Sequence, residues 1–142
     1  MRPFVWLFAA FSVAALAGCP GPDDPGTPEC VTVDPSCAPL YQPVYDEIFT
    51  RTLAPTCGVA GNSCHSSEGR KNGLAFADPD EAFDLLLGSD GHPRVSPGDP
   101  ECSLIVERLA SSDPDFQMPP GAPLSAAEQC VIQQWIADGA KR

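Results

Sequence analysis

The sequence predicts an all-α domain with long loops, and three observations support this prediction. Apolar residues recur at helical spacing in several separate segments. Residues that cap or end helices stand at the ends of these segments, and no stretch alternates apolar and polar residues as a half-buried strand does. The chain has 142 residues, enough for one domain after loss of a leader. We therefore expect a signal peptide at 1–18, a flexible Pro/Gly-rich tether at 19–39 and one helical domain at 40–142.

The first 18 residues have the features of a signal peptide. Arg2 supplies a positive charge, and an apolar run follows that is too short to span a bilayer. The run ends in Leu16-Ala17-Gly18-Cys19, which resembles the lipobox of bacterial lipoproteins. This resemblance implies cleavage before Cys19 and lipid on its sulfur, which anchors the mature protein in the bacterial cell envelope on the periplasmic or cell-surface side. The alternative is ordinary export with a structural Cys19.

The tether begins with a Pro/Gly-rich stretch that has no apolar periodicity and cannot bury a core. Further along it, Cys30 and Cys37 bracket a segment that is able to turn back on itself. Because exported proteins mature in an oxidising compartment, a local disulfide between these two cysteines is the simplest expectation.

The first two helices are predicted by spacing and by capping. Apolar residues at helical spacing predict a helix from Pro43 to Leu53, and Pro55 is expected to end it. A capping box begins at Asp78, with proline at the first helical position, and predicts a short helix that runs to about Leu87.

The last two helices have equally local signals. Asp99 and Pro100 are expected to open the third helix. One face of that helix carries Cys102, Ile105, Val106 and Leu109. Ser125 is expected to cap the fourth helix, and Gly139 to end it. The buried stripe of the fourth helix is expected to consist of Val131, Ile132, Trp135 and Ile136.

The segment from Cys57 to His65 is the most informative about function. Its two glycines and its asparagine predict a loop. Two cysteines with a histidine directly after the second are, in an exported protein, the order of the c-type haem attachment motif. The usual spacing places two residues between the cysteines, and here there are six. The longer loop would either still deliver both sulfurs, from Cys57 and Cys64, to a haem or close on itself as a disulfide.

Met118 is the candidate for a second iron ligand. It is the one methionine after the leader, and two prolines that stiffen its loop follow it. Histidine and methionine together are a known axial pair of haem iron. The alternative is a methionine packed under a loop. Earlier in the chain, His92 is expected to be an exposed loop residue. Arg94 is expected to be an ordinary surface arginine rather than a partner of a haem propionate.

Several segments together resemble the planctomycete-type cytochrome c domain. They are Cys64-His65, Pro97-Gly98-Asp99-Pro100, Met118-Pro119-Pro120 and Trp135-Ile136-Ala137-Asp138-Gly139-Ala140. The resemblance runs from about residue 48 to residue 140. It implies a small cytochrome c-like helical fold with haem c as cofactor, and an electron carrier rather than an enzyme. It also implies His65 and Met118 as proximal and distal iron ligands, and Cys57 and Cys64 as thioether positions.

The other cysteines are disulfide candidates. Apart from Cys19 and the two haem positions, they are Cys30, Cys37, Cys102 and Cys130. We expect the pairs Cys30–Cys37 and Cys102–Cys130. Cys130 lies almost opposite the buried stripe of its helix, so the alternative is that its partner lies in the tether. Without haem, all six cysteines would be able to form three disulfides.

The composition excludes some functions and leaves two. With 8 basic against 19 acidic residues and a net charge of −11, the chain repels phosphate backbones, which excludes nucleic-acid binding. The charge suits solubility beside a membrane or steering toward a basic redox protein. No serine and histidine with an orienting acid at recognisable spacing suggest a hydrolase, and zinc lacks an obvious fourth ligand. The two remaining functions are a membrane-anchored monohaem electron-transfer protein and a haem-free, disulfide-stapled surface or interaction lipoprotein.

Overall fold

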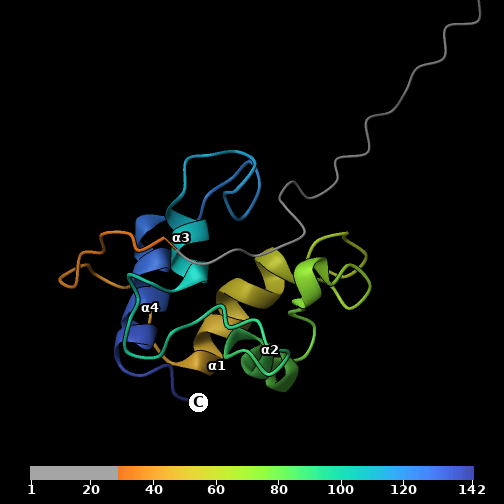
Figure 1. Ribbon diagram of the computed structural model, residues 1–142, viewed down its shortest axis with the longest axis horizontal. Helices are drawn as coiled ribbons and strands as arrows, with labels where there is room; N and C mark the ends of the chain where they lie inside the picture. Colours follow the sequence, from red (N-terminus) through yellow and green to blue (C-terminus); the bar gives the residue numbers. More distant parts are fainter. Residues whose placement is uncertain (1–28) are drawn as a thin grey trace, which may run out of the picture.

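The computed structural model describes residues 29–142, which form an all-α domain with long loops (Figure 1). Its helices are α1 (Tyr45–Ile48), α2 (Pro79–Leu86), α3 (Leu104–Ala110) and α4 (Ala126–Ala137), with a π-helix, η1 (Phe49–Cys57), continuing α1 and a short 3-10 turn, η2, at Lys71–Gly73. The described residues contain no strand, so the predicted fold class is confirmed. The predicted signal peptide and Cys19 lie outside these residues. No helix within 29–142 combines the length and the apolar character needed to cross a membrane.

Aromatic side chains from three helices meet in the core. The ring of Tyr45 on α1 lies 4.9 Å from that of Phe83 on α2 and 5.6 Å from that of Trp135 on α4, measured between centroids. The polar atoms of these rings have partners, because the Tyr45 hydroxyl donates to the Pro79 carbonyl and the Trp135 indole N–H donates to the Lys141 carbonyl. The core therefore fixes α1 against both α2 and α4.

The predictions for α2 and α4 are confirmed. The Asp78 carboxylate accepts the backbone N–H groups of Asp80 and Glu81 at the start of α2. At the start of α4, Ser125 and Glu128 form the reciprocal capping box. All four residues of the predicted α4 stripe are buried: Val131, Ile132, Trp135 and Ile136. Just past the end of α4, Gly139 has a φ of +96°, the left-handed conformation that favours glycine.

The predicted end of the first helix is wrong. Helical structure does not stop before Pro55 but continues as η1 to Cys57. In a π-helix the hydrogen bonds join residues five apart, and the Gly58 N–H accordingly donates to the Leu53 carbonyl at 2.9 Å. Pro55 has no N–H to donate, and the helix continues past it with this wider hydrogen-bond pattern. As a consequence Cys57 stands at a helix end and not within the predicted loop.

The predicted start of the third helix is also wrong, because α3 begins at Leu104. Asp99 closes a turn in front of the helix: its carboxylate accepts the Cys102 N–H, and its carbonyl accepts the Ser103 hydroxyl. Cys102 therefore lies in this turn, outside the helix. The face that α3 turns to the core includes Val106 and Leu109 as expected.

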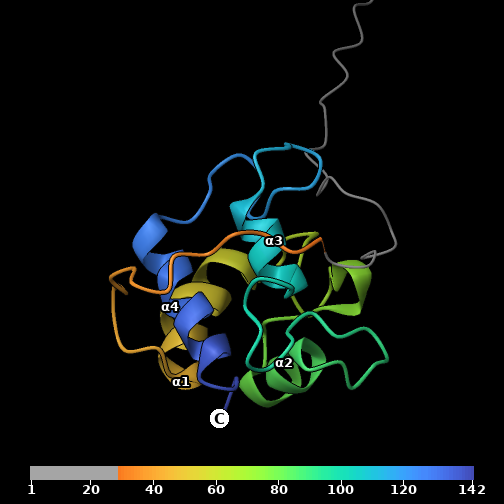
Figure 2. The same ribbon diagram turned by 60° about the vertical axis from the view of Figure 1, so that its left-hand side comes forward.

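The disulfides join Cys30 to Cys102 and Cys37 to Cys130. All four predicted cysteines are thus oxidised, but the expected pairs are wrong, and the alternative that Cys130 pairs with a cysteine of the tether is correct. The physical reason is that residues 29–40, here called the strap, lie across α3 and α4 instead of folding back on themselves (Figure 2).

Hydrogen bonds hold the strap along its length. The Val31 N–H donates to the Glu101 carbonyl at 2.8 Å, and the Leu40 N–H donates to the Ala127 carbonyl at 3.1 Å. Between these points, the Gln134 side-chain amide donates to the Cys37 carbonyl at 2.8 Å. The described part of the predicted tether is therefore packed on the domain by bonds to the α3 and α4 regions.

Candidate cofactor site

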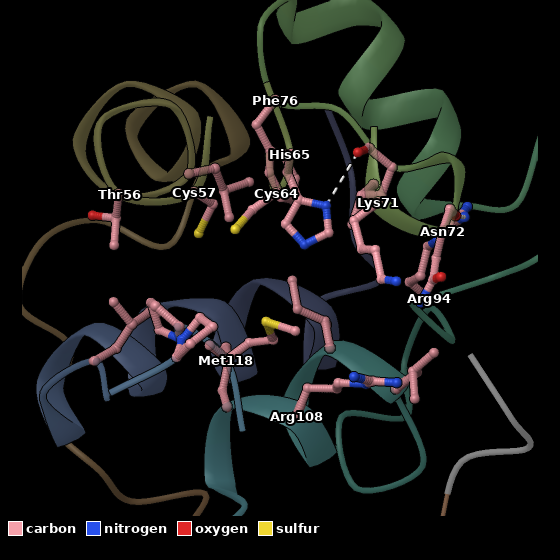
Figure 3. A pocket seen from close by; sticks show the side chains of 18 of the residues that line it. Thr56, Cys57, Cys64, His65, Lys71, Asn72, Phe76, Arg94, Arg108 and Met118 are labelled. Atoms are coloured by element: carbon pink, nitrogen blue, oxygen red, sulfur yellow. Dashed lines mark hydrogen bonds between the residues drawn. The ribbon is translucent and has the colours of Figure 1, made fainter. Parts of the chain in front are cut away.

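A pocket opens between η1, the loop that contains His65, α3 and the loop that contains Met118 (Figure 3). Its empty volume is about 980 Å³, part of which is open to solvent. Much of its wall is apolar and consists of Leu53, Leu74, Phe76, Leu104, Ile105, Leu109 and Leu124.

His65 presents one ring nitrogen to this pocket. Its Nδ1 lies 3.1 Å from the Leu74 carbonyl oxygen, and because a carbonyl only accepts, Nδ1 carries the hydrogen. The lone pair is then on Nε2, which points into the open space (Figure 3). Burial lowers the pKa of His65 and keeps the imidazole neutral. A neutral imidazole whose second nitrogen is held by a carbonyl is the usual form of a metal-binding histidine.

Backbone hydrogen bonds hold the loop that carries His65. The His65 carbonyl accepts the Phe76 N–H at 2.8 Å, and the Cys64 carbonyl accepts the Lys71 N–H at 2.7 Å. The Asn62 side chain accepts the Cys64 N–H at 3.1 Å. The edge-on Phe76 ring packs against the imidazole with 5.5 Å between centroids. The position of the ring is therefore set by its own loop and by the segment that returns after η2.

Cys57 and Cys64 lie on the same side of the pocket as His65, with both sulfurs close to the open space (Figure 3). Cys57 is the free cysteine of the described residues, so the disulfide alternative between Cys57 and Cys64 is wrong for this structure. Burial raises the pKa of the Cys57 thiol to about 11 and keeps it protonated near neutral pH. Cys64 is disulfide-bonded, so a thioether at Cys64 requires that bond to be absent.

Met118 lies across the pocket from His65 (Figure 3). Its N–H donates to the Arg108 carbonyl at 2.9 Å, which ties the Met118 loop to α3. Within the loop, the Gln117 side-chain amide donates to the Ser111 carbonyl at 2.8 Å. The structure therefore places all four residues that the sequence analysis selected for a cofactor, Cys57, Cys64, His65 and Met118, around one pocket.

Arg94 is buried, with 4% of its surface exposed, and the expectation of a surface arginine is wrong. Its Nη1 donates to the Leu85 carbonyl and the Asp90 carboxylate, each at 2.8 Å, and its Nη2 donates to the Asn72 carbonyl at 2.6 Å. The bond to Arg94 lowers the pKa of Asp90. The role of Arg94 is thus to join the η2 turn to the loop that follows α2. His92, in that same loop, is exposed as expected.

Arg108 is a pocket residue that the sequence analysis did not select. It lies on α3 with 7% of its surface exposed, and its Nη2 has no hydrogen-bond partner among the described residues. A signal was present in the sequence, because Arg108 follows Leu104 by four residues and so shares the buried side of α3 with it.

Among residues 29–142, no group of three or more histidine, cysteine, aspartate or glutamate side chains is arranged to hold a metal ion. A haem iron does not need such a group, because the porphyrin supplies four ligands and the protein supplies at most two axial ones.

Comparison with known families gives a match over residues 62–121, to the family described as Planctomycete cytochrome C. This match supports a planctomycete-type cytochrome c domain over these residues. The match to planctomycete cytochrome c includes His65, Arg108 and Met118, and it begins after Cys57. Neither the curated proteins nor the solved structures gave a match.

Similarity to planctomycete cytochrome c implies haem c binding in general, and the residues of this pocket fit that group. His65 offers a neutral imidazole nitrogen on one side of the pocket, and Met118 offers a thioether sulfur on the other. The walls between them are apolar, as the face of a porphyrin requires, and Arg108 offers an unsatisfied donor for an acidic substituent.

Proposed function

We propose that the protein is a monohaem c-type electron carrier in which Cys57, Cys64 and His65 hold the haem and Met118 is the distal ligand. The observation that carries this proposal is the opposed pair of His65 Nε2 and Met118 in an apolar pocket (Figure 3). When bound, haem supplies reversible one-electron chemistry of iron. The net charge of −11 favours a basic redox protein as the partner.

Each pocket residue has a definite part in this function. The Leu74 carbonyl orients the His65 imidazole and raises its basicity as a ligand. If Met118 holds the iron of a bound haem, its thioether would favour the reduced state, because a soft neutral sulfur stabilises Fe(II) relative to Fe(III). The apolar walls would limit the contact of a bound haem with water, which would disfavour the extra positive charge of the oxidised state.

The path of the chain accommodates the long spacing between Cys57 and Cys64. Because η1 continues past Pro55, the helix itself brings Cys57 to the edge of the pocket. At Gly58 the backbone passes so close to the Phe76 carbonyl that a Cβ atom would clash with it. The residues between the cysteines then turn away and return at Cys64, which supports a haem held by two sulfurs on one wall.

The test is whether haem stays on the unfolded protein. The full chain is produced in a host with c-type haem attachment and then denatured in acid and guanidinium. Thioethers survive unfolding, whereas bonds from His65 or Met118 to iron do not, so the haem is expected to remain with the polypeptide through precipitation and gel electrophoresis. A matched Cys57→Ala, Cys64→Ala double variant is expected to lose it. Colourless parent protein from that host would contradict the proposal.

A haem-free, disulfide-stapled surface or interaction lipoprotein is the second candidate function. It is favoured by the two disulfides that hold the strap, because they staple the domain without a cofactor. Parent protein that carries no haem, with Cys64 still oxidised by mass analysis, is the outcome that would select this function.

We propose in addition that Cys19, which lies outside the described residues, carries the lipid anchor. The Cys19→Ser variant is expected to move from the membrane fraction to the soluble fraction, because several acyl chains on one residue are the attachment. Cys57→Ser is the matched control and is expected to stay with the membrane. Detergent partitioning of Cys19→Ser that is equal to that of the parent would contradict lipidation.

A further inference from the structure

We propose that Arg108 binds a carboxylate of the cofactor, a haem propionate, inside the pocket. This inference rests on the proposed function and adds to it the residue that fixes the acidic side of the haem. It is specific to Arg108 and does not extend to Arg94, the other arginine that lines the pocket.

The burial of Arg108 calls for an anionic hydrogen-bond partner, and among the described residues Glu107 acts on its charge without such a bond. Its side chain is 93% buried, and Nη2 is closed to solvent with no acceptor in residues 29–142. A buried guanidinium without a counter-charge is strongly unfavourable. The neighbouring carboxylate on α3, that of Glu107, accepts the Glu29 N–H of the strap at 3.1 Å. A carboxylate group of a bound ligand would supply Arg108 with both a counter-charge and a hydrogen-bond acceptor.

The remaining contacts of Arg108 orient its guanidinium without satisfying it. The group stacks on the Phe116 ring at 4.1 Å from the centroid, and Nη1 makes a long bond of 3.5 Å to the Phe116 carbonyl. Arg108 lies on the Met118 side of the pocket (Figure 3). A planar guanidinium held in this way matches the two oxygens of a carboxylate better than an ammonium group does.

Arg94 does not compete for this role, because its guanidinium already has three acceptors. These are the Leu85 and Asn72 carbonyls and the Asp90 carboxylate, which also supplies the counter-charge. Arg94 is therefore paired with a carboxylate within the protein, whereas Arg108 has no hydrogen-bonded carboxylate among the described residues.

The test compares the thermal midpoint of unfolding with and without haem. The full chain is prepared from hosts with and without c-type haem attachment, as the parent, Arg108→Met, Arg108→Lys and the exposed control Arg51→Met. In the haem-free form, Arg108→Met is expected to equal or exceed the parent, because it removes an unpaired buried charge. In the haem form its midpoint is expected to fall by about 5 °C or more, because the propionate then loses its partner.

The conservative and control variants separate charge pairing from packing. Arg108→Lys keeps the charge but not the planar fork, so in the haem form it is expected to lie between the parent and Arg108→Met. Arg51→Met is expected to shift both forms equally, since Arg51 does not line the pocket. Equal shifts of the haem and haem-free forms by Arg108→Met, or by Arg108→Lys if the methionine variant does not fold, would show a purely structural role and overturn the inference. Parent protein without covalent haem would instead overturn the proposed function, and this inference with it.

Discussion

The His65→Ala variant is expected to lose the visible absorption of a six-coordinate haem protein, while the thioethers keep the haem on the chain. His65 is the histidine whose free nitrogen faces the pocket, and the carbonyl of Leu74 fixes it in the neutral form that binds iron. Alanine removes this ligand and leaves the rest of the pocket wall in place. The measurement is the haem-to-protein ratio together with the visible spectrum.

His92→Ala is the matched control for this experiment. His92 is the other histidine of the chain, and it is exposed in the loop that follows α2. Its replacement is expected to leave haem content and spectrum unchanged. If the His65 variant kept the parent spectrum, His65 would not be the proximal ligand, and the proposal that it binds iron in this pocket would be wrong.

Replacing Met118 by alanine is expected to leave the haem attached and to lower the reduction potential on the order of 0.1 V, a fraction of the range of about 0.8 V that axial ligands cover. The cause is the loss of the thioether, which favours reduced iron. The attachment is unaffected, because Cys57 and Cys64 lie on the opposite side of the pocket (Figure 3). Potentiometric titration of the purified parent and variant measures the change.

Met118→Leu distinguishes ligation from packing. Leucine fills nearly the same volume but offers no sulfur, so the potential of this variant is expected to fall as far as that of Met118→Ala. A potential close to that of the parent in Met118→Leu would identify Met118 as a residue that only fills space beneath its loop.

Short sequence patterns were sufficient to predict those parts of the fold that depend on interactions between residues close in sequence. The caps at Asp78 and Ser125 act within three residues, and both helices begin where these residues predict. The end of the first helix depended instead on a change of hydrogen-bond pattern at Pro55, which the α-helical rule for proline does not anticipate. The disulfide partner of Cys37 is 93 residues away, and nothing in the spacing of the cysteines encodes such a crossing.

Some residues of the candidate site could likewise be predicted from local sequence patterns, and others could not. The order of Cys64 and His65 and the prolines after Met118 are local patterns, and they were enough to select residues that the structure places around one pocket. Which arginine faces that pocket with an unsatisfied nitrogen depends on how α3 packs and on which carbonyls lie near Arg94. These are tertiary relations between segments that are distant in sequence, so the sequence predicted a surface position for Arg94 and did not select Arg108.

The disulfides of the strap also determine how the domain would respond to mechanical load. Nine residues, 20–28, separate the proposed anchor at Cys19 from Glu29, a distance of at most about 35 Å when fully extended. Tension along this segment reaches the Cys30–Cys102 bond one residue beyond Glu29 and passes through a covalent link to the turn before α3. A pull from the membrane would therefore load this covalent link before it could peel the rest of the strap from α4.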